Sequence, residues 1–256
     1  MISRINTFLW YIKNPNYWGQ LFNLILRKFY YKDDEFGKDE AETWCRGKGK
    51  NREAILSLNE NLRITTLIDP AIAYKNLFEE VYQKISNIPL IMGEGSDIII
   101  LYNLVRLRNV KKVLETGVAY GWSSLAILLA FQEKKEGILY STDMPYAKMN
   151  NEKYVGTIVP EKLHVYWKLI RKPDIKAIPE AIRLCGNFDL IHYDSDKSYS
   201  GKKWAYPLLW KALNYGGFFI SDDINDNIAF KEFCHDINKK PLIIKNTGKY
   251  IGILTK

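Results

Sequence analysis

The sequence predicts an α/β protein in which a doubly wound, mainly parallel sheet of seven strands is covered by helices on both faces. Two observations carry this prediction. From residue 110 onward, short apolar runs alternate with longer stretches of helical periodicity, as expected for parallel strands joined by crossover helices. The last 15 residues break the alternation, because two apolar runs separated by a glycine-containing turn are typical of an antiparallel hairpin. Helices are expected ahead of the sheet.

The predicted elements follow from this alternation. Strands are expected at 112–116, 138–142, 163–169, 189–193, 217–221, 242–245 and 250–255. Helices between them are expected at 121–132, 148–155, 174–184, 198–213 and 226–238. Before the sheet we expect helices at 53–62, 70–86 and 97–108, the second capped by Asp69. Residues 33–52 are charged and contain three glycines, which indicates a loop. We therefore divide the chain into a helical N-terminal region, 1–90, and a sheet domain, 91–256.

Charge is unevenly distributed along the chain. The 256 residues include 37 Lys and Arg against 29 Asp and Glu, a net charge of +8, and 47% of the residues are hydrophobic. This apolar content excludes a disordered chain. Residues 1–32 hold five basic and no acidic residues, which leaves a net charge of only +3 for residues 33–256. The near-neutral remainder argues against a nucleic-acid partner.

Residues 1–32 are also amphipathic. Apolar residues recur at helical spacing from Ile5 to Ile12, and again after Pro15 from Trp18 to Phe29. One interpretation is a segment that binds the membrane surface, because basic residues beside an apolar stripe suit anionic lipids. The other is a pair of helices that pack on the protein's own core or on a second subunit of a homo-oligomer. We favour the second, because amphipathic helices usually face protein.

The compartment is predicted from what the sequence lacks. No apolar run reaches the roughly 18 residues that span a bilayer, and no secretory signal pattern is present. The three cysteines are widely spaced and form no CxxC pair, which suits a reducing compartment. We expect a cytoplasmic protein, peripheral at the inner membrane face if residues 1–32 bind lipid.

A glycine-containing turn follows the first predicted strand of the sheet. Glu115, Gly117, Gly121 and Ser123 form the pattern E-x-G-x-x-x-G-x-S, in which the glycines allow close backbone approach and open a helix able to bind an anion. Asp143 ends the next strand, 28 residues after Glu115, where a carboxylate can accept hydrogen bonds from both ribose hydroxyls of a nucleoside. The alternative is a plain structural turn followed by a solvated strand end.

Further motifs connect this turn to a known family. They are Met92-Gly93-Glu94-Gly95, Asp194-Ser195-Asp196, Gly216-Gly217 and Asp222-Asp223. With the glycine turn they resemble the class I S-adenosylmethionine (SAM)-dependent methyltransferases, and more closely the small-molecule and sugar O-methyltransferase branch, over residues 88–256. The resemblance implies a Rossmann-like fold that ends in the antiparallel hairpin.

The resemblance also implies which residues bind the cofactor. Gly117, Val118 and Gly121 would line the methionine portion of SAM, and Asp143 would bind its ribose. Ser123 and the loop at Gly93 and Glu94 would hold the amino and carboxyl groups. We count Glu115 and Asp194 among the expected cofactor residues as well.

Four aspartates follow two predicted strands of the sheet. Asp194 and Asp196 follow 189–193, and Asp222 and Asp223 follow 217–221. Because the carboxyl ends of strands in an open α/β sheet open onto the ligand crevice, we expect these side chains to converge. A divalent cation such as Mg²⁺ would neutralise their mutual repulsion. The alternative is that they cap the helices that follow.

The spacing of these aspartates is similar to the metal triad of divalent-cation-dependent, catechol-type O-methyltransferases. Asp222 and Asp223 follow Asp194 by 28 and 29 positions. The resemblance implies Asp194, Asp222 and Asp223 as Mg²⁺ ligands and Lys197 as the catalytic base. Similarity to some sugar methyltransferases implies Asp196 as the base instead.

The sequence therefore predicts an enzyme that moves a methyl group from SAM to a hydroxyl of a small molecule or sugar, in polysaccharide or natural-product biosynthesis, with the help of a divalent metal. Two alternatives remain open at this point: the same fold with hydroxylase-like or N-methyltransferase chemistry, and a nucleic-acid-modifying protein.

Overall fold

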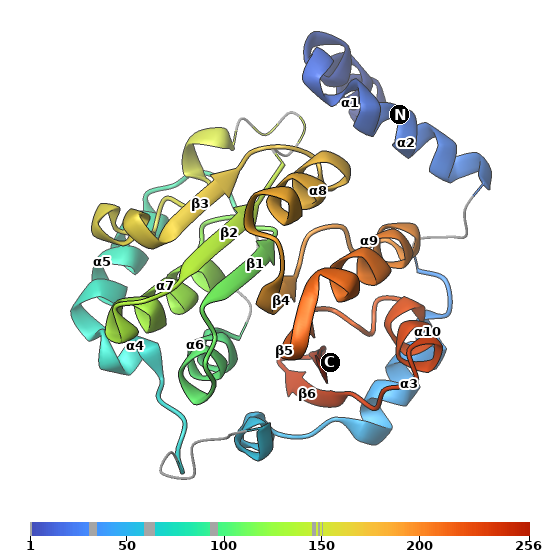
Figure 1. Ribbon diagram of the computed structural model, residues 1–256. Coiled ribbons are helices and arrows are strands. Elements are labelled where there is room, and N and C mark those ends of the chain that lie inside the picture. Colours follow the sequence, from blue (N-terminus) through green and yellow to red (C-terminus); the bar gives the residue numbers. More distant parts are fainter. Residues whose placement is uncertain are drawn as a thin grey trace.

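The computed structural model describes residues 2–30, 35–58, 65–92, 97–144, 147, 149 and 151–256. It contains a seven-stranded sheet in the order β3-β2-β1-β4-β5-β7-β6, which confirms the predicted fold class (Figure 1). The strands are β1 (Lys112–Thr116), β2 (Ile138–Thr142), β3 (Trp167–Ile170), β4 (Phe188–Tyr193), β5 (Leu213–Ser221), β6 (Leu242–Asn246) and β7 (Lys249–Thr255). β1 to β5 pair in parallel, and β7 is antiparallel to both β5 and β6.

Helices cover both faces of the sheet because successive strand residues point to opposite sides. On one face Val113, Leu190 and Phe218 pack beneath α5 (Lys75–Ser86), α6 (Ile98–Leu107) and α7 (Trp122–Lys134). On the other face the next residue of each strand packs beneath α3 (Lys38–Lys48), α8 (Asp174–Cys185), α9 (Tyr199–Ala212) and α10 (Ala229–Asp236). The central strands are therefore buried on both sides, and successive residues such as Val113 and Leu114 are both apolar for this reason.

Two further helices lie at the end of the sheet toward which β1 and β2 point (Figure 1). They are α1 (Ile2–Lys13) and α2 (Trp18–Tyr30), joined by a 3-10 turn at Pro15–Tyr17. The indole Nε1 of Trp18 donates to the carbonyl of Tyr11 at 2.9 Å, and the rings of Trp10 and Tyr17 lie 5.2 Å apart. In the part of the chain that the structure describes, no helix is long and apolar enough to cross a membrane.

The expected loop at 33–52 is wrong for most of its length, because α3 occupies residues 38–48. Acidic residues lie in the first turn of α3 and basic residues in the last, as the helix dipole favours. Ala41 and Cys45, four residues apart, are fully buried against the sheet. Lys50 then exchanges backbone hydrogen bonds of 2.8 and 2.9 Å with Ile243 and Lys245 of β6. This segment is therefore part of the folded structure.

Smaller differences concern helical turns. The predicted strand 163–169 begins as a 3-10 helix, Glu161–Tyr166, because Pro160 favours a helical start, so β3 begins only at Trp167. The expected helices 53–62 and 148–155 are 3-10 turns at Arg52–Leu58 and Glu152–Tyr154 within the described residues. The helix 70–86 is interrupted at Tyr74 into α4 (Pro70–Ala73) and α5. Asp69 caps α4 as expected, accepting from the Ala71 N–H at 2.8 Å.

Candidate functional site

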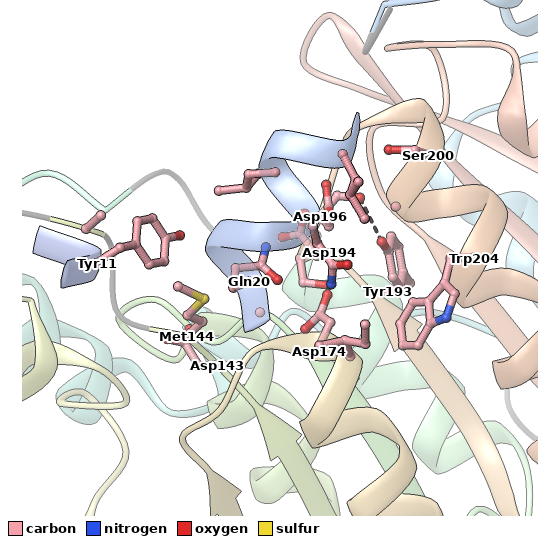
Figure 2. A pocket seen from close by; sticks show the side chains of 18 residues that line it. Tyr11, Gln20, Asp143, Met144, Asp174, Tyr193, Asp194, Asp196, Ser200 and Trp204 are labelled. Atoms are coloured by element: carbon pink, nitrogen blue, oxygen red, sulfur yellow. Dashed lines mark hydrogen bonds between the residues drawn. The ribbon is translucent and has the colours of Figure 1, made fainter. Parts of the chain in front are cut away.

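A cavity of about 420 Å³ lies at the carboxyl ends of β1, β2 and β4. This volume falls within the range of about 300–1,000 Å³ that is usual for small-molecule and cofactor sites. The sheet supplies Gly117, Asp143 and Asp194 to its wall, and α1 and α2 supply Tyr11 and Gln20 (Figure 2). The cavity therefore forms where open α/β sheets bind ligands, and the N-terminal helices form part of its wall.

The β1–α7 turn requires glycine at two positions. Gly117 has a φ of +83°, and a Cβ at this position would overlap the carbonyl oxygen of Asp194. Gly121 has a φ of +103° and immediately precedes α7. The Gly117 N–H donates to the carbonyl of Thr142 at 2.8 Å. The turn is thus pressed against both neighbouring strands. Gly117 lines the cavity, whereas Val118 and Gly121, also predicted to contact the cofactor, are not part of its wall.

Asp143 connects this turn to the end of β2. Its Oδ2 accepts the backbone N–H groups of Val118 and Ala119 at 2.9 and 3.1 Å. Among the described residues its buried Oδ1 has no hydrogen-bond partner, and the Arg171 guanidinium lies 4.0 Å away. Burial raises the pKa of Asp143, against the opposing effect of the two backbone hydrogen bonds. One oxygen therefore fixes the turn, and the other can accept a ligand hydroxyl, so this residue fits the ribose of SAM.

Glu115 and Ser123 lie outside the lining of the cavity. Glu115 is fully buried and accepts the hydroxyls of Ser124 and Ser141, and Ser123 also bonds to it. Burial raises the pKa of Glu115, an effect that these hydroxyl donors oppose. Glu115 thus joins β1, β2 and α7 and supports the turn from below. Gly93 and Glu94 lie outside the described residues, so their contact with the cofactor stays a prediction.

The predicted metal ligands form a cluster beside the cavity. Asp194 lines the cavity, whereas Asp222 and Asp223 are not part of its wall. Lys197 contacts Asp223, and its Nζ lies 3.3 Å from Asp194 Oδ1. Lys249 Nζ approaches Asp223 Oδ1 to 3.1 Å. The β4 and β5 ends do bring the three carboxylates together, but with lysines between them.

A buried histidine completes this cluster. His192 Nε2 lies 3.4 Å from Asp222 Oδ1. Although burial disfavours its charged form, Asp222 raises the pKa of His192 to about 9. Burial and the nearby Asp222 raise the pKa of Asp194 to about 6. Against its own burial, Lys197 has a raised pKa, because Asp194 and Asp223 stabilise its ammonium form.

These residues do not fit the expected Mg²⁺ site. Three carboxylates, Asp194, Asp222 and Asp223, already face three cationic groups, supplied by Lys197, Lys249 and His192. A divalent ion would have to displace ammonium groups that compensate the same charges. Across the described residues, no group of three or more His, Cys, Asp or Glu side chains is arranged to hold a metal ion. The repulsion that the sequence indicated is relieved by protein cations.

Asp196 has a role in the turn before α9. Its Oδ1 accepts the Ser198 N–H at 3.1 Å and the Ser198 hydroxyl at 2.7 Å, and Ser198 in turn caps α9 through the Gly201 N–H. Asp196 therefore supports the cap of α9 but does not form it, because the N-cap residue is Ser198 and not Asp196 as the alternative proposed. Asp196 also lines the cavity, together with Trp204 of α9 (Figure 2).

Several residues of the cavity were not predicted from the sequence. Tyr11, Gln20, Asn23 and Leu24 line it from α1 and α2. Tyr11 is only 4% exposed. No motif marks these residues, and Tyr11 lies 132 positions before Asp143 in the chain. Only the packing of the N-terminal helices over the sheet brings them to the site.

Comparison with known proteins finds one family model that matches part of the chain and several solved structures of the same fold. Residues 114–224 match the model of a family described as a methyltransferase domain. The O-methyltransferase from Bacillus cereus, solved in complex with SAH, is 14% identical with a TM-score of 0.55, over 84% of this chain and 100% of that chain. TomG from Streptomyces achromogenes, an O-methyltransferase of tomaymycin synthesis solved with SAM, is 13% identical with a TM-score of 0.53, over 81% and 99%.

A third solved structure is the apo form of CalS11, a TDP-rhamnose 3′-O-methyltransferase of calicheamicin biosynthesis. It is 13% identical with a TM-score of 0.51, over 77% of this chain and 99% of that chain. No curated protein matches the sequence significantly. At these identities, the likeness to the three solved structures is one of fold.

Proposed function

From the premise that the chain carries a methyltransferase domain in the class I, SAM-dependent fold, we propose that it transfers a methyl group from SAM to a hydroxyl of a small molecule or sugar. One observation carries the proposal. Asp143 lines a cavity of suitable size and uses one oxygen to fix the glycine turn, while its other oxygen is buried and has no hydrogen-bond partner within the described residues. A ribose hydroxyl is the donor that this oxygen suits.

The cofactor would lie between the glycine turn and the N-terminal helices. Gly117 leaves room for the methionine portion, Val118 and Gly121 shape the same turn, and Asp143 accepts the ribose hydroxyls. When bound, SAM supplies an electrophilic methyl group on its sulfonium sulfur. The helices α1 and α2 border the cavity through Tyr11 and Gln20.

A carboxylate of the cavity is the best candidate for the base. The acceptor hydroxyl must lose its proton as its oxygen forms the new bond to carbon. Asp194 lines the cavity, and a pKa of about 6 suits proton uptake near neutral pH. Lys197 stays an ammonium ion, so we assign it the positioning of Asp194 instead of proton transfer. Asp196 would then bind a second hydroxyl of the acceptor.

The acceptor class is supported by the chemistry of the wall and by the neighbours. The wall includes the carboxylate of Asp196 and the indole of Trp204. This combination suits a polyhydroxylated ring, because a carboxylate accepts hydrogen bonds from hydroxyls and an indole covers an apolar face of the ring. One protein of the same fold acts on TDP-rhamnose. A divalent cation has no step in this mechanism, since Lys197, Lys249 and His192 already compensate the carboxylates.

Calorimetric titration with SAM tests the cofactor. We expect Asp143→Asn to bind SAM about 10- to 100-fold more weakly, because a hydrogen bond to a charged group contributes about 1.5–3 kcal/mol. Asp196→Asn, at the other side of the cavity, is the matched control and should bind SAM as the unmodified protein does. Absence of SAM binding by the unmodified protein would contradict the proposal.

Methyl transfer from labelled SAM to TDP-rhamnose and to a catechol, each with and without a chelator, tests the acceptor and the metal. We expect equal transfer with the chelator, and a loss of about 100-fold or more in Asp194→Asn. Loss of transfer on chelation, restored by Mg²⁺, would instead establish the catechol-type metal mechanism.

A further inference from the structure

The apolar face of α2 points away from the protein. Trp18, Phe22 and Ile25, spaced four and three residues apart, are 55%, 62% and 42% exposed. At 100° per residue, Gln20 and Asn23 lie on the opposite side of the helix, and both line the cavity. An amphipathic helix that packed on its own core would show the reverse arrangement. The interpretation favoured from the sequence is packing on the protein's own core or on a second subunit, and its first form does not describe this face.

The helix α1 continues the same outward surface. Phe8, Leu9 and Ile12 are each exposed by nearly half, whereas Tyr11 is buried toward the cavity. We call the six residues Phe8, Leu9, Ile12, Trp18, Phe22 and Ile25 the outer apolar face. Among the described residues, 16 large apolar side chains are exposed, and these six fall within 18 consecutive positions. Such concentration marks a binding surface, whereas single exposed apolar residues are ordinary.

The two helices are held in this orientation from the inside. Tyr17 lies close enough to the site for Arg171, Glu152 and Asp143 to act on its pKa, which burial raises. Trp18 donates to the Tyr11 carbonyl, and Asn14 Nδ2 donates to the Trp10 carbonyl at 2.7 Å. The two hydrogen bonds hold α1 against α2, and Tyr17 between the helices lies toward the site, on the side away from the exposed apolar residues.

Charge identifies what covers the outer apolar face. The sequence of residues 1–32 contains five basic residues and no acidic one. Two copies of this segment, meeting face to face, would bring ten positive charges together without a compensating carboxylate, which disfavours a symmetric dimer. An anionic lipid surface complements both properties, since its headgroups attract the lysines and arginines and its acyl boundary accepts the apolar side chains.

We propose that α1 and α2 form a membrane-docking element whose outer apolar face inserts into the interface of an anionic bilayer. The inner side of the same helices lines the cavity, so docking places the mouth of the site beside the lipid surface. This inference rests on the exposed face and the charge of the segment, and it stands independently of the reaction proposed above.

Vesicle sedimentation tests the docking. The full chain is mixed with phosphatidylcholine vesicles, or with vesicles that also contain phosphatidylglycerol. We expect binding only to the anionic vesicles, weakened by added salt because the attraction is partly electrostatic. The double variant Trp18→Ser/Phe22→Ser should bind at least about 10-fold more weakly, because it removes two inserting side chains. Neither residue lines the cavity, so SAM affinity reports that the variant is folded.

The matched control is Val165→Ser/Tyr215→Ser. Both residues are large, apolar and highly exposed, but they lie outside α1 and α2. This control should bind anionic vesicles like the unmodified chain. Equal binding by the Trp18/Phe22 variant would overturn the proposal, as would no binding to anionic vesicles at all. A concentration-dependent dimer that the Trp18/Phe22 variant abolishes, without vesicle binding, would assign the face to a second copy instead.

Discussion

Two groups of carboxylates at the same edge of the sheet are stabilised in different ways. Asp143 and Glu115, near β1 and β2, face backbone N–H groups and serine hydroxyls. Asp194, Asp222 and Asp223, after β4 and β5, face Lys197, Lys249 and His192. Neutral donors make the hydrogen bonds of the first group, with the Arg171 guanidinium 4.0 Å from Asp143, whereas cations contact the second group directly.

The difference separates a binding site from a charge cluster. Hydrogen bonds from neutral donors orient a carboxylate without cancelling its charge, and they leave Asp143 Oδ1 available to a ligand. Cations cancel the charge, which makes a metal ion redundant but makes the stability of the cluster depend on pH. The three predictions below test how far the two groups differ.

The two groups meet at Gly117, where the largest effect is expected. In Gly117→Ala, the new Cβ would overlap the Asp194 carbonyl oxygen in a backbone conformation with a φ of +83°. We expect a loss of at least about 3 kcal/mol in the free energy of unfolding, together with loss of SAM binding, because the turn must move away from β4. Denaturant unfolding and calorimetry measure the two effects.

Gly248→Ala is the control for backbone strain. Gly248 has a φ of +80°, but a Cβ there meets nothing within 4 Å. This variant should lose only about 1 kcal/mol, the cost of placing alanine in the left-handed region. If the two variants lose equal stability, then the close approach between the turn and Asp194 has no energetic consequence.

His192 should make the cation-stabilised cluster sensitive to alkaline pH. Its pKa in the folded protein is about 9, above its ordinary value of 6.5. The contribution of His192 to the stability of the folded protein is therefore fully present below about pH 6.5 and is lost as the pH rises through 9. The shift corresponds to a contribution on the order of 3 kcal/mol. We expect His192→Gln to lack this loss when unfolding is followed from pH 6 to 10.

Lys202 has the opposite effect on the pH dependence of stability between pH 6 and 10, because burial lowers its pKa to about 8. Its folded-state pKa is depressed, so its effect favours folding as the pH rises. Lys202 is present in both proteins, and the difference between them therefore isolates His192. A constant difference across the pH range would show that His192 is neutral in the folded protein.

The centre of the fold was predictable because its signals are local. β1 and β2 have the predicted bounds, since each contains consecutive buried apolar residues and ends at a polar residue before a turn. The helix α3 was missed because its charged composition and flanking glycines obscure the two small buried residues, Ala41 and Cys45. Its burial depends on α10 and the sheet, which are far away in sequence.

The site, like the fold, was predictable where its residues lie close together in the sequence. The turn containing Gly117 and the aspartate at the end of β2 lie within one strand–helix–strand unit, so their spacing carries the information. Lys249 lies in β7, on the hairpin that pairs with β5, and its contact with Asp223 depends on that pairing. The sequence indicated the negative charges of the cluster. It did not show which cations compensate them.

The smallest effect is expected for Lys249, the most exposed cation of the cluster. Its side chain is 60% exposed, against 44% for Lys197, and among the described residues its ion-pair partner is Asp223 alone. We expect Lys249→Met to cost less than about 1 kcal/mol at neutral pH, as for other exposed ion pairs, and Lys197→Met to cost more, because it removes a partner of two carboxylates. Denaturant unfolding compares the two variants.

Acidic pH should remove the destabilisation caused by Lys249→Met and by Lys197→Met, because both lysines act on the Asp223 carboxylate. Against the effect of burial, Lys197 and Lys249 hold the pKa of Asp223 below its ordinary value. The stabilisation is therefore present above the ordinary carboxyl pKa and is lost as the pH falls through the depressed one. Unfolding at acidic pH should then give nearly equal stabilities for the unmodified protein and the Lys249→Met variant. A cost that persists in acid would mean that Lys249 contributes through packing of its aliphatic chain, and the cluster would depend on one lysine and one histidine.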